Sequence, residues 1–155
     1  REGDPLEIFT DKEGEVILKK YSPIGELNEF ATEYAESISD SLGEVGLVTD
    51  RDTIIAVSGG SKKEYLEKRV SRELEEAMAE KKPLVITDKD KVYPITSDEG
   101  EEVKYTSQII VPIVTQGDPI GSVIILPKMP DKLLGDMEMK VAETAANFLG
   151  KQMEQ

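Results

Sequence analysis

The most apolar part of the chain consists of two short runs that a turn separates. Residues 109–114 and 120–126 are dominated by isoleucine and valine, which favour strands. Gln116-Gly117-Asp118 lies between them and has the composition of a tight hairpin turn. Neither run alternates between apolar and polar positions, so both faces of these strands should be covered. The pattern therefore predicts a hairpin at the centre of a sheet.

Two residues inside these runs predict local departures from regular pairing. Pro112 has no N–H to donate, so a bulge or an unpaired site is expected near it. Gly121 has no side chain and should let a neighbouring element approach the second strand closely.

Helical spacing of apolar residues appears near both ends of the chain. From Pro23 to Leu42 they recur at intervals of three and four, with Ser22 as expected N-cap and Gly43 as expected C-cap. A second helix is expected over 133–152, capped by Asp131. It carries two apolar stripes, which are Met137, Val141, Thr144 and Phe148, and Met139, Ala142, Ala146, Leu149 and Met153.

One apolar stripe is enough to cover a sheet, so the second stripe predicts another contact. That contact is either with the first helix of the same chain or with a second copy, in a four-helix bundle across a two-fold axis. The small residues Ala142, Ala145 and Ala146 would allow close approach in such a bundle. The interface candidates are Ile24, Leu27, Tyr34, Ile38, Met137, Val141 and Phe148, and the expected state is a homodimer or homotetramer.

The rest of the chain predicts shorter elements. Hairpins are expected at 6–21 and 45–58, short helices at 64–68 and 70–81, and a strand at 84–87. Residues 88–104 are polar and should form a mobile loop with one weak strand near 92–95, and this loop could act as a lid. Its acidic centre lacks the spacing of an EF-hand, so a solvated loop is favoured over a calcium site.

A glycine-rich turn precedes the first short helix. Ser61 and Glu64 have the spacing of a capping box, which is the favoured interpretation. The alternative is an anion site at a helix start, for which the candidate residues are Ser58, Gly59, Gly60, Ser61 and Lys62. The spacing of a P-loop is missing.

Composition narrows the possible functions. The 155 residues carry a formal charge of −13, which gives no general affinity for nucleic acid. The chain has no cysteine or histidine, which excludes disulfides and Cys–His or Ser–His catalytic pairs and argues against a metal site. We therefore expect no enzyme, no catalytic residues and no cofactor. No apolar run approaches a membrane span, so we expect a cytoplasmic protein.

Two stretches resemble known families. Residues 112–125 read P-I-x-x-x-G-x-P-I-G-x-V-I-I, which resembles the central hairpin of GAF domains, small sensory domains that hold a ligand or a partner against one sheet. Residues 1–24, REGDPLEIFTDKEGEVILKKYSPI, resemble the second half of an AbrB-type swapped-hairpin DNA-binding domain. A GAF domain behind such a hairpin resembles the stage V sporulation protein T family, transcription regulators of endospore formation.

This resemblance implies an α+β fold in two parts. Residues 1–21 would form the second half of the swapped-hairpin barrel, and residues 22–155 a GAF-like regulatory domain with a central antiparallel sheet and helices on its faces. The family's first half, which holds most basic DNA-contacting residues, is missing, so DNA would be bound through that half and by no residue of this chain. The expected function is regulatory, with an unidentified small-molecule effector as a further partner. A purely structural oligomerisation module without ligand is the alternative.

Overall fold

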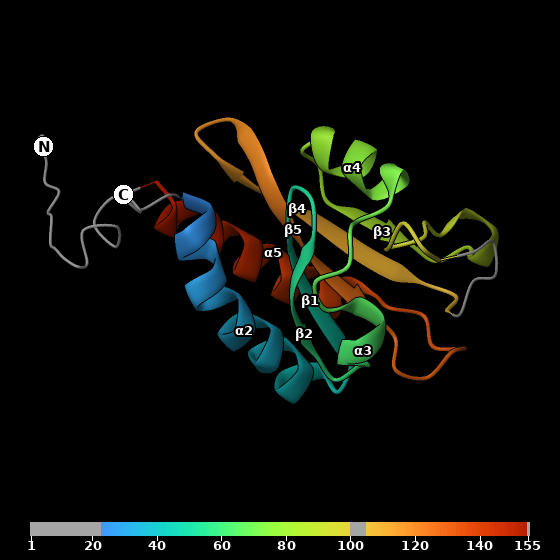
Figure 1. The fold of residues 1–155 in the computed structure, drawn as a ribbon. Helices are drawn as coiled ribbons and strands as arrows, with labels where there is room; N and C mark the ends of the chain where they lie inside the picture. Colours follow the sequence, from blue (N-terminus) through green and yellow to red (C-terminus); the bar gives the residue numbers. More distant parts are fainter. Residues whose placement is uncertain (1–22, 100–104, 155) are drawn as a thin grey trace, which may run out of the picture.

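A computed structural model describes residues 23–99 and 105–154 as a five-stranded sheet with helices on both faces (Figure 1). The spatial order is β2-β1-β5-β4-β3, and every neighbouring pair is antiparallel. The fold is α+β, as predicted, and the hairpin of β4 and β5 provides the central strand β5. The strands are β1 Val45–Asp50, β2 Ile54–Ser58, β3 Leu84–Ile86, β4 Gln108–Thr115 and β5 Asp118–Leu126.

The central hairpin shows the predicted turn and irregularities. Gln116 and Gly117 form a two-residue turn with φ angles of 50° and 85°, and two successive positive values are typical of a type I′ hairpin turn. The register shifts between Ile113 and Val114, next to Pro112. A Cβ on Gly121 would lie 2.0 Å from the carbonyl oxygen of Thr49, so only glycine fits there.

Two long helices cover one face of the sheet. α2 spans Pro23–Leu42 and α5 spans Asp136–Gln152, and they lie on the same side in Figure 1. Gly43 follows α2 with a φ of 72°, as expected of a helix C-cap. Apolar residues of both helices share one core cluster with the side chains of β4 and β5 that face them.

Shorter elements cover the opposite face. These are α3 Lys62–Tyr65, α4 Arg72–Ala79 and the chain that follows the 3₁₀ helix η1 Lys89–Lys91. Their apolar side chains form a second cluster with the other face of β1 and β5. Apart from β3, every described strand therefore carries buried side chains on both of its faces. This explains why the runs 109–114 and 120–126 do not alternate between apolar and polar residues.

The start of α5 differs from the prediction. The helix begins at Asp136, and Asp131 does not cap it. The Glu138 carboxylate instead accepts a hydrogen bond of 2.8 Å from the backbone N–H of Gly135. The connection before it is held by the buried Glu44 carboxylate, which accepts from the Lys128 N–H at 2.8 Å and pairs with the Lys132 ammonium.

The predicted polar loop is partly a packed cover. The expected strand over 92–95 is absent from its described part, residues 88–99. Val92 and Ile95 are buried in the second cluster, and Glu99 accepts hydrogen bonds from the N–H groups of Ile95 and Thr96. This segment is therefore fixed by its apolar residues and by one carboxylate, features that its polar composition concealed.

The short helices are also shifted. α3 begins directly after its cap Ser61, and α4 begins after Ser71, because each serine hydroxyl accepts the N–H three residues on. Val70, predicted inside the second helix, instead forms an isolated bridge with Thr96. The predictions for the hairpin at 6–21 and the Ser22 cap lie outside the described residues.

Candidate functional site

The glycine-rich turn of residues 58–62 has a packing role. Ser61 Oγ accepts the Glu64 N–H at 3.1 Å, which is the serine half of the predicted capping box. A Cβ on Gly59 would lie 2.7 Å from both the Glu44 carbonyl oxygen and Ser39 Oγ, and one on Gly60 would lie 2.8 Å from Val45 Cγ1. The turn therefore approaches the end of α2 and the start of β1 more closely than a side chain would allow.

The candidate pocket residues of this turn do lie together, from Ser58 at the end of β2 to Lys62 at the start of α3. The turn adjoins the α3–α4 face, whose core contains Tyr65 and Tyr105. Burial raises the pKa of both hydroxyls, with the Glu99 carboxylate as the next cause. Tyr105 Oη donates to the Tyr93 carbonyl oxygen at 3.2 Å. Large side chains thus occupy this face of the sheet.

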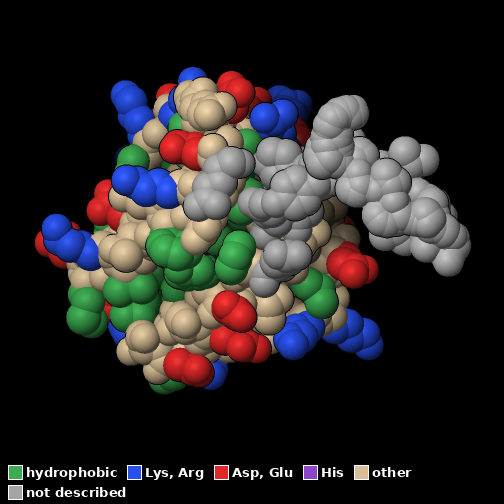
Figure 2. Space-filling model, turned by 90° about the vertical axis from the view of Figure 1, so that its left-hand side faces the viewer, with side chains coloured by type: hydrophobic (Ala, Val, Ile, Leu, Met, Phe, Trp, Pro, Cys, Tyr) green, Lys and Arg blue, Asp and Glu red, His purple; other side chains and the backbone are tan. Residues whose placement is uncertain are grey.

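An apolar surface runs along the outside of the two long helices. Met137 is 65% exposed and Phe148 43% exposed, although both lie in α5. Val141 lies between them and is partly buried, and the Tyr34 ring of α2 lies 5.3 Å from the Phe148 ring. We call these four residues the α2–α5 surface. Figure 2 shows hydrophobic side chains gathered on the face that carries the left-hand ends of α2 and α5 in Figure 1.

The remaining interface candidates are Leu27, Ile38 and Ile24. Leu27 and Ile38 are 0% and 2% exposed and belong to the chain's own core, so they offer no surface to a partner. Ile24 lies in α2, and its side chain is outside the description. The second stripe of α5 is buried against the sheet within one chain, as expected of the stripe that covers it.

The alanines of α5 also serve the chain's own core, contrary to the predicted bundle contact. Ala142, Ala145 and Ala146 are buried in the first cluster. At Gly150 a Cβ would lie 2.5 Å from the carbonyl oxygen of Val114, so the helix lies almost against the backbone of β4. Small residues in α5 therefore allow close packing on the sheet, a role that spacing alone does not distinguish from contact with a second chain.

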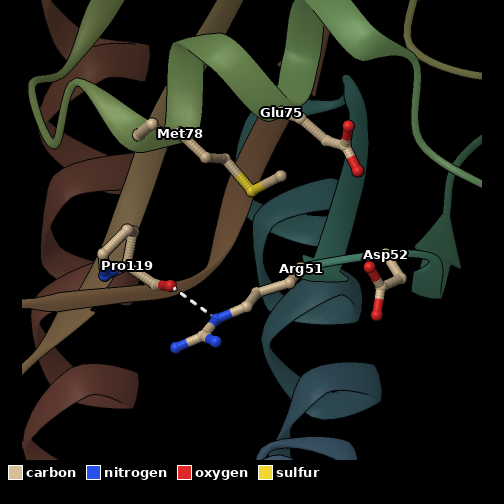
Figure 3. Close-up of a pocket in the computed structure, with 6 residues that line it drawn as sticks. Arg51, Asp52, Glu75, Met78 and Pro119 are labelled. Carbon is tan, nitrogen blue, oxygen red and sulfur yellow. Dashed lines mark hydrogen bonds between the residues drawn. The ribbon is translucent and has the colours of Figure 1, made fainter.

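A surface cavity of about 450 Å³ lies on the α4 side of the sheet (Figure 3). Its lining joins the β1–β2 turn, α4 and the first residues of β5, and consists of Arg51, Asp52, Glu75, Met78, Ala79 and Pro119. Arg51 Nε donates to the Pro119 carbonyl oxygen at 3.0 Å. No sequence pattern predicts this cavity, because its residues come from three distant segments without a shared motif.

Other kinds of site find no support in the part of the chain that the structure describes. There, no three acidic side chains come together as a metal site would require. No helix of that part is long and apolar enough to cross a membrane.

Comparison with known proteins decides the family. The family described as stage V sporulation protein T C-terminal, transcription factor, matches residues 26–154. A relative from Bacillus subtilis (strain 168), stage V sporulation protein T, is 52% identical over all 155 residues and 84% of its own length. The chain belongs to the stage V sporulation protein T family. It is thereby a member of a family of sporulation transcription factors, as the resemblance of its hairpins implied.

Solved structures confirm the GAF fold of this family member. The GAF domain of Thermosynechococcus elongatus PixJ has a TM-score of 0.67 at 14% identity, covering 88% of this chain and 89% of that domain. A GAF domain from an Acinetobacter phosphoenolpyruvate-protein phosphotransferase has a TM-score of 0.65 at 14% identity, covering 90% and 86%. A free methionine-R-sulfoxide reductase from Thermoplasma acidophilum scores 0.59 at 14% identity, covering 82% and 94%. These likenesses concern the fold alone.

Proposed function

We propose that this chain is the self-association and regulatory part of a sporulation transcription factor, and that two copies meet through the α2–α5 surface. The observation that carries the proposal is where exposed apolar side chains lie. Five large hydrophobic residues are exposed in the described part of the chain, and two of them, Met137 and Phe148, belong to this surface. Two more, Met129 and Leu133, lie in the segment that leads to α5.

The energetics of association support this role. Burying a large apolar side chain contributes roughly 1.5–3 kcal/mol, so a few such residues from each copy give a useful contribution. A charge of −13 on each copy opposes association, and an apolar contact can offset that repulsion while charged side chains remain in water. The Tyr34–Phe148 ring contact orients Phe148 within each copy before the copies meet.

A structural role fits the α3–α4 side better than an effector held at residues 58–62. Gly59 and Gly60 are in close contact with neighbouring segments, and the Ser61 hydroxyl caps α3. The self-association that we propose requires neither a ligand there nor catalysis, and we infer that the chain is not an enzyme.

Sedimentation velocity of the chain at tens of micromolar tests the proposal. We expect a dimer or larger species for the unchanged chain and a monomer for Met137→Asp and Phe148→Asp, because each places a charge in the apolar contact. The matched control is Val85→Asp, which charges an exposed apolar position on β3, a strand that contributes no residue to the α2–α5 surface. A monomeric unchanged chain would refute the proposal. A dimer that all three variants leave intact would move the interface elsewhere, with the hairpin region 1–21 as the first place to look.

DNA binding is proposed for the whole transcription factor and not for this chain alone. The relative from Bacillus subtilis extends beyond the 84% of its length that the chain matches. We expect residues 1–155 to give no tight, sequence-selective mobility shift, because the charge of −13 repels phosphate. The whole protein should bind with an affinity that falls steeply with salt. A tight shift by residues 1–155 would contradict this.

A further inference from the structure

The cavity of Figure 3 lies between two parts of the fold. Glu75, Met78 and Ala79 come from α4, while the β1–β2 turn and Pro119 form the opposite wall. A volume of about 450 Å³ lies within the usual range for small-molecule sites. The cavity is separate from the α2–α5 surface, which lies across the sheet.

Opposite charges lie at different ends of this cavity. In Figure 3 the carboxylates of Asp52 and Glu75 lie at one end, while the guanidinium of Arg51 is directed toward Pro119 at the other. The bond from Arg51 Nε to the Pro119 carbonyl fixes the guanidinium, and its terminal N–H groups have no acceptor among the described residues. Glu75 has an ion pair at 3.9 Å with the exposed Arg69, at the long limit for such contacts.

A buried pair of hydroxyls lies behind one wall. Thr49 Oγ1 and Ser122 Oγ are 2.7 Å apart and fully buried, and Thr49 Oγ1 lies 3.7 Å from the sulfur of Met78. A thioether is a weak acceptor, so one of the two hydroxyl hydrogens has only a poor partner. Met78 lines the cavity, so its side chain lies between this donor and the cavity.

We propose that the cavity binds a small zwitterion of the amino-acid class. The ligand carboxylate pairs with the Arg51 guanidinium, and its ammonium lies between Asp52 and Glu75. The apolar part of the ligand packs on Met78, Ala79 and Pro119. A simple anion would meet two carboxylates, and a simple cation would meet the guanidinium, so a molecule with both charges fits the arrangement best.

The twenty free L-amino acids, each tested separately by calorimetry and by thermal unfolding of the 155-residue chain, provide the test. We expect at least one with an apolar or flexible side chain to bind saturably and to raise Tm as its concentration rises. The N-acetyl and the carboxamide derivatives of that amino acid should each bind about tenfold more weakly or worse, because each loses a charge-assisted contact. Equal binding of either derivative would contradict the proposal, as would binding by none of the twenty.

Single-residue variants test whether the ligand binds in this cavity. Arg51→Gln and Asp52→Asn should each weaken it about tenfold, and Ala79→Phe should abolish it by filling the cavity without changing charge. Arg72→Gln is the matched control, because Arg72 is exposed on α4 and pairs with Glu76 outside the cavity. Binding that survives both Arg51→Gln and Ala79→Phe would place the ligand elsewhere and overturn the assignment. These readouts do not depend on the oligomeric state, so this proposal stands or falls separately from the proposed function.

Discussion

The two faces of the sheet are covered in different ways. On one face two long helices pack closely, through Ala142, Ala146 and Gly150 of α5, and keep apolar side chains on their outer side. On the other face short helices and the chain after η1 bury large side chains, among them Tyr65 and Tyr105, and present mainly charged residues outside. A single sheet thus carries an apolar outer surface on one side and a charged cavity on the other.

This difference suits the two faces of the sheet to two different roles. Close helix–sheet packing places a rigid apolar stripe at the surface, which suits contact with a second copy. On the other face, bulkier side chains and a cover rich in turns pack on the sheet. They leave a cavity between α4 on one side and the β1–β2 turn and Pro119 on the other. We expect self-association to respond to changes on the first face and small-molecule binding to changes on the second.

The largest expected effect comes from removing one core leucine on each face. Leu149→Ala on the α5 side and Leu74→Ala on the α4 side should each lower the free energy of unfolding by about 2–5 kcal/mol, because both side chains are fully buried. Urea unfolding measures both. The double variant should show the sum of the two losses, because the sheet separates the sites. Strong non-additivity would mean that the faces form one cooperative core and would weaken the comparison.

Close packing of α5 is tested by a smaller change. Gly150→Val should cost about 1–3 kcal/mol of unfolding free energy, because the added side chain meets the backbone of β4. Asn147→Val introduces the same side chain on the exposed side of the same helix and should cost much less. Equal losses for the two variants in urea unfolding would show that the helix can move off the sheet at little cost.

Alkaline pH should destabilise the chain through the α3–α4 face. Burial raises the pKa of Tyr65 and Tyr105 above the value of about 10 in an unfolded chain. The unfolded state therefore loses these protons first, and stability that is present below pH 10 is lost as the pH rises. The loss at pH 11 should reach about 1.4 kcal/mol for each tyrosine.

Phenylalanine variants isolate this effect. Tyr65→Phe and Tyr105→Phe should each reduce the fall in urea midpoint between pH 9 and 11. Tyr34→Phe, on the half-exposed α2–α5 surface, should reduce it less, although burial raises the pKa of Tyr34 as well. A larger effect of Tyr34→Phe would contradict the attribution of the alkaline loss of stability to Tyr65 and Tyr105.

The parts that the sequence predicted well are those fixed by local patterns. The run 109–126 combines non-alternating apolar strands with a turn that contains Gly117, and the structure has the same hairpin at its centre. α2 follows from apolar spacing and Gly43. The two stripes of α5 are real, and one of them covers the sheet.

The errors arose where tertiary contacts override composition. Glu138 reaches back to cap α5 at Gly135, so the helix starts later than Asp131 suggested. Residues 88–99 look polar, yet Val92 and Ile95 anchor them in the core. The cavity joins segments about 70 residues apart in the sequence, from Arg51 to Pro119. Contacts between such distant segments leave no local spacing pattern in the sequence.

The central claim, that two copies meet along α5, is tested most directly by distances between spin labels. The chain has no cysteine, so Thr144→Cys places a single label on the exposed stripe between Met137 and Phe148. Thr87→Cys, just beyond β3, serves as the matched control. We predict a short, narrow distance between copies for the label at 144 and a longer one for the label at 87. No dipolar signal between copies at 144, or a shorter distance at 87, would contradict the account.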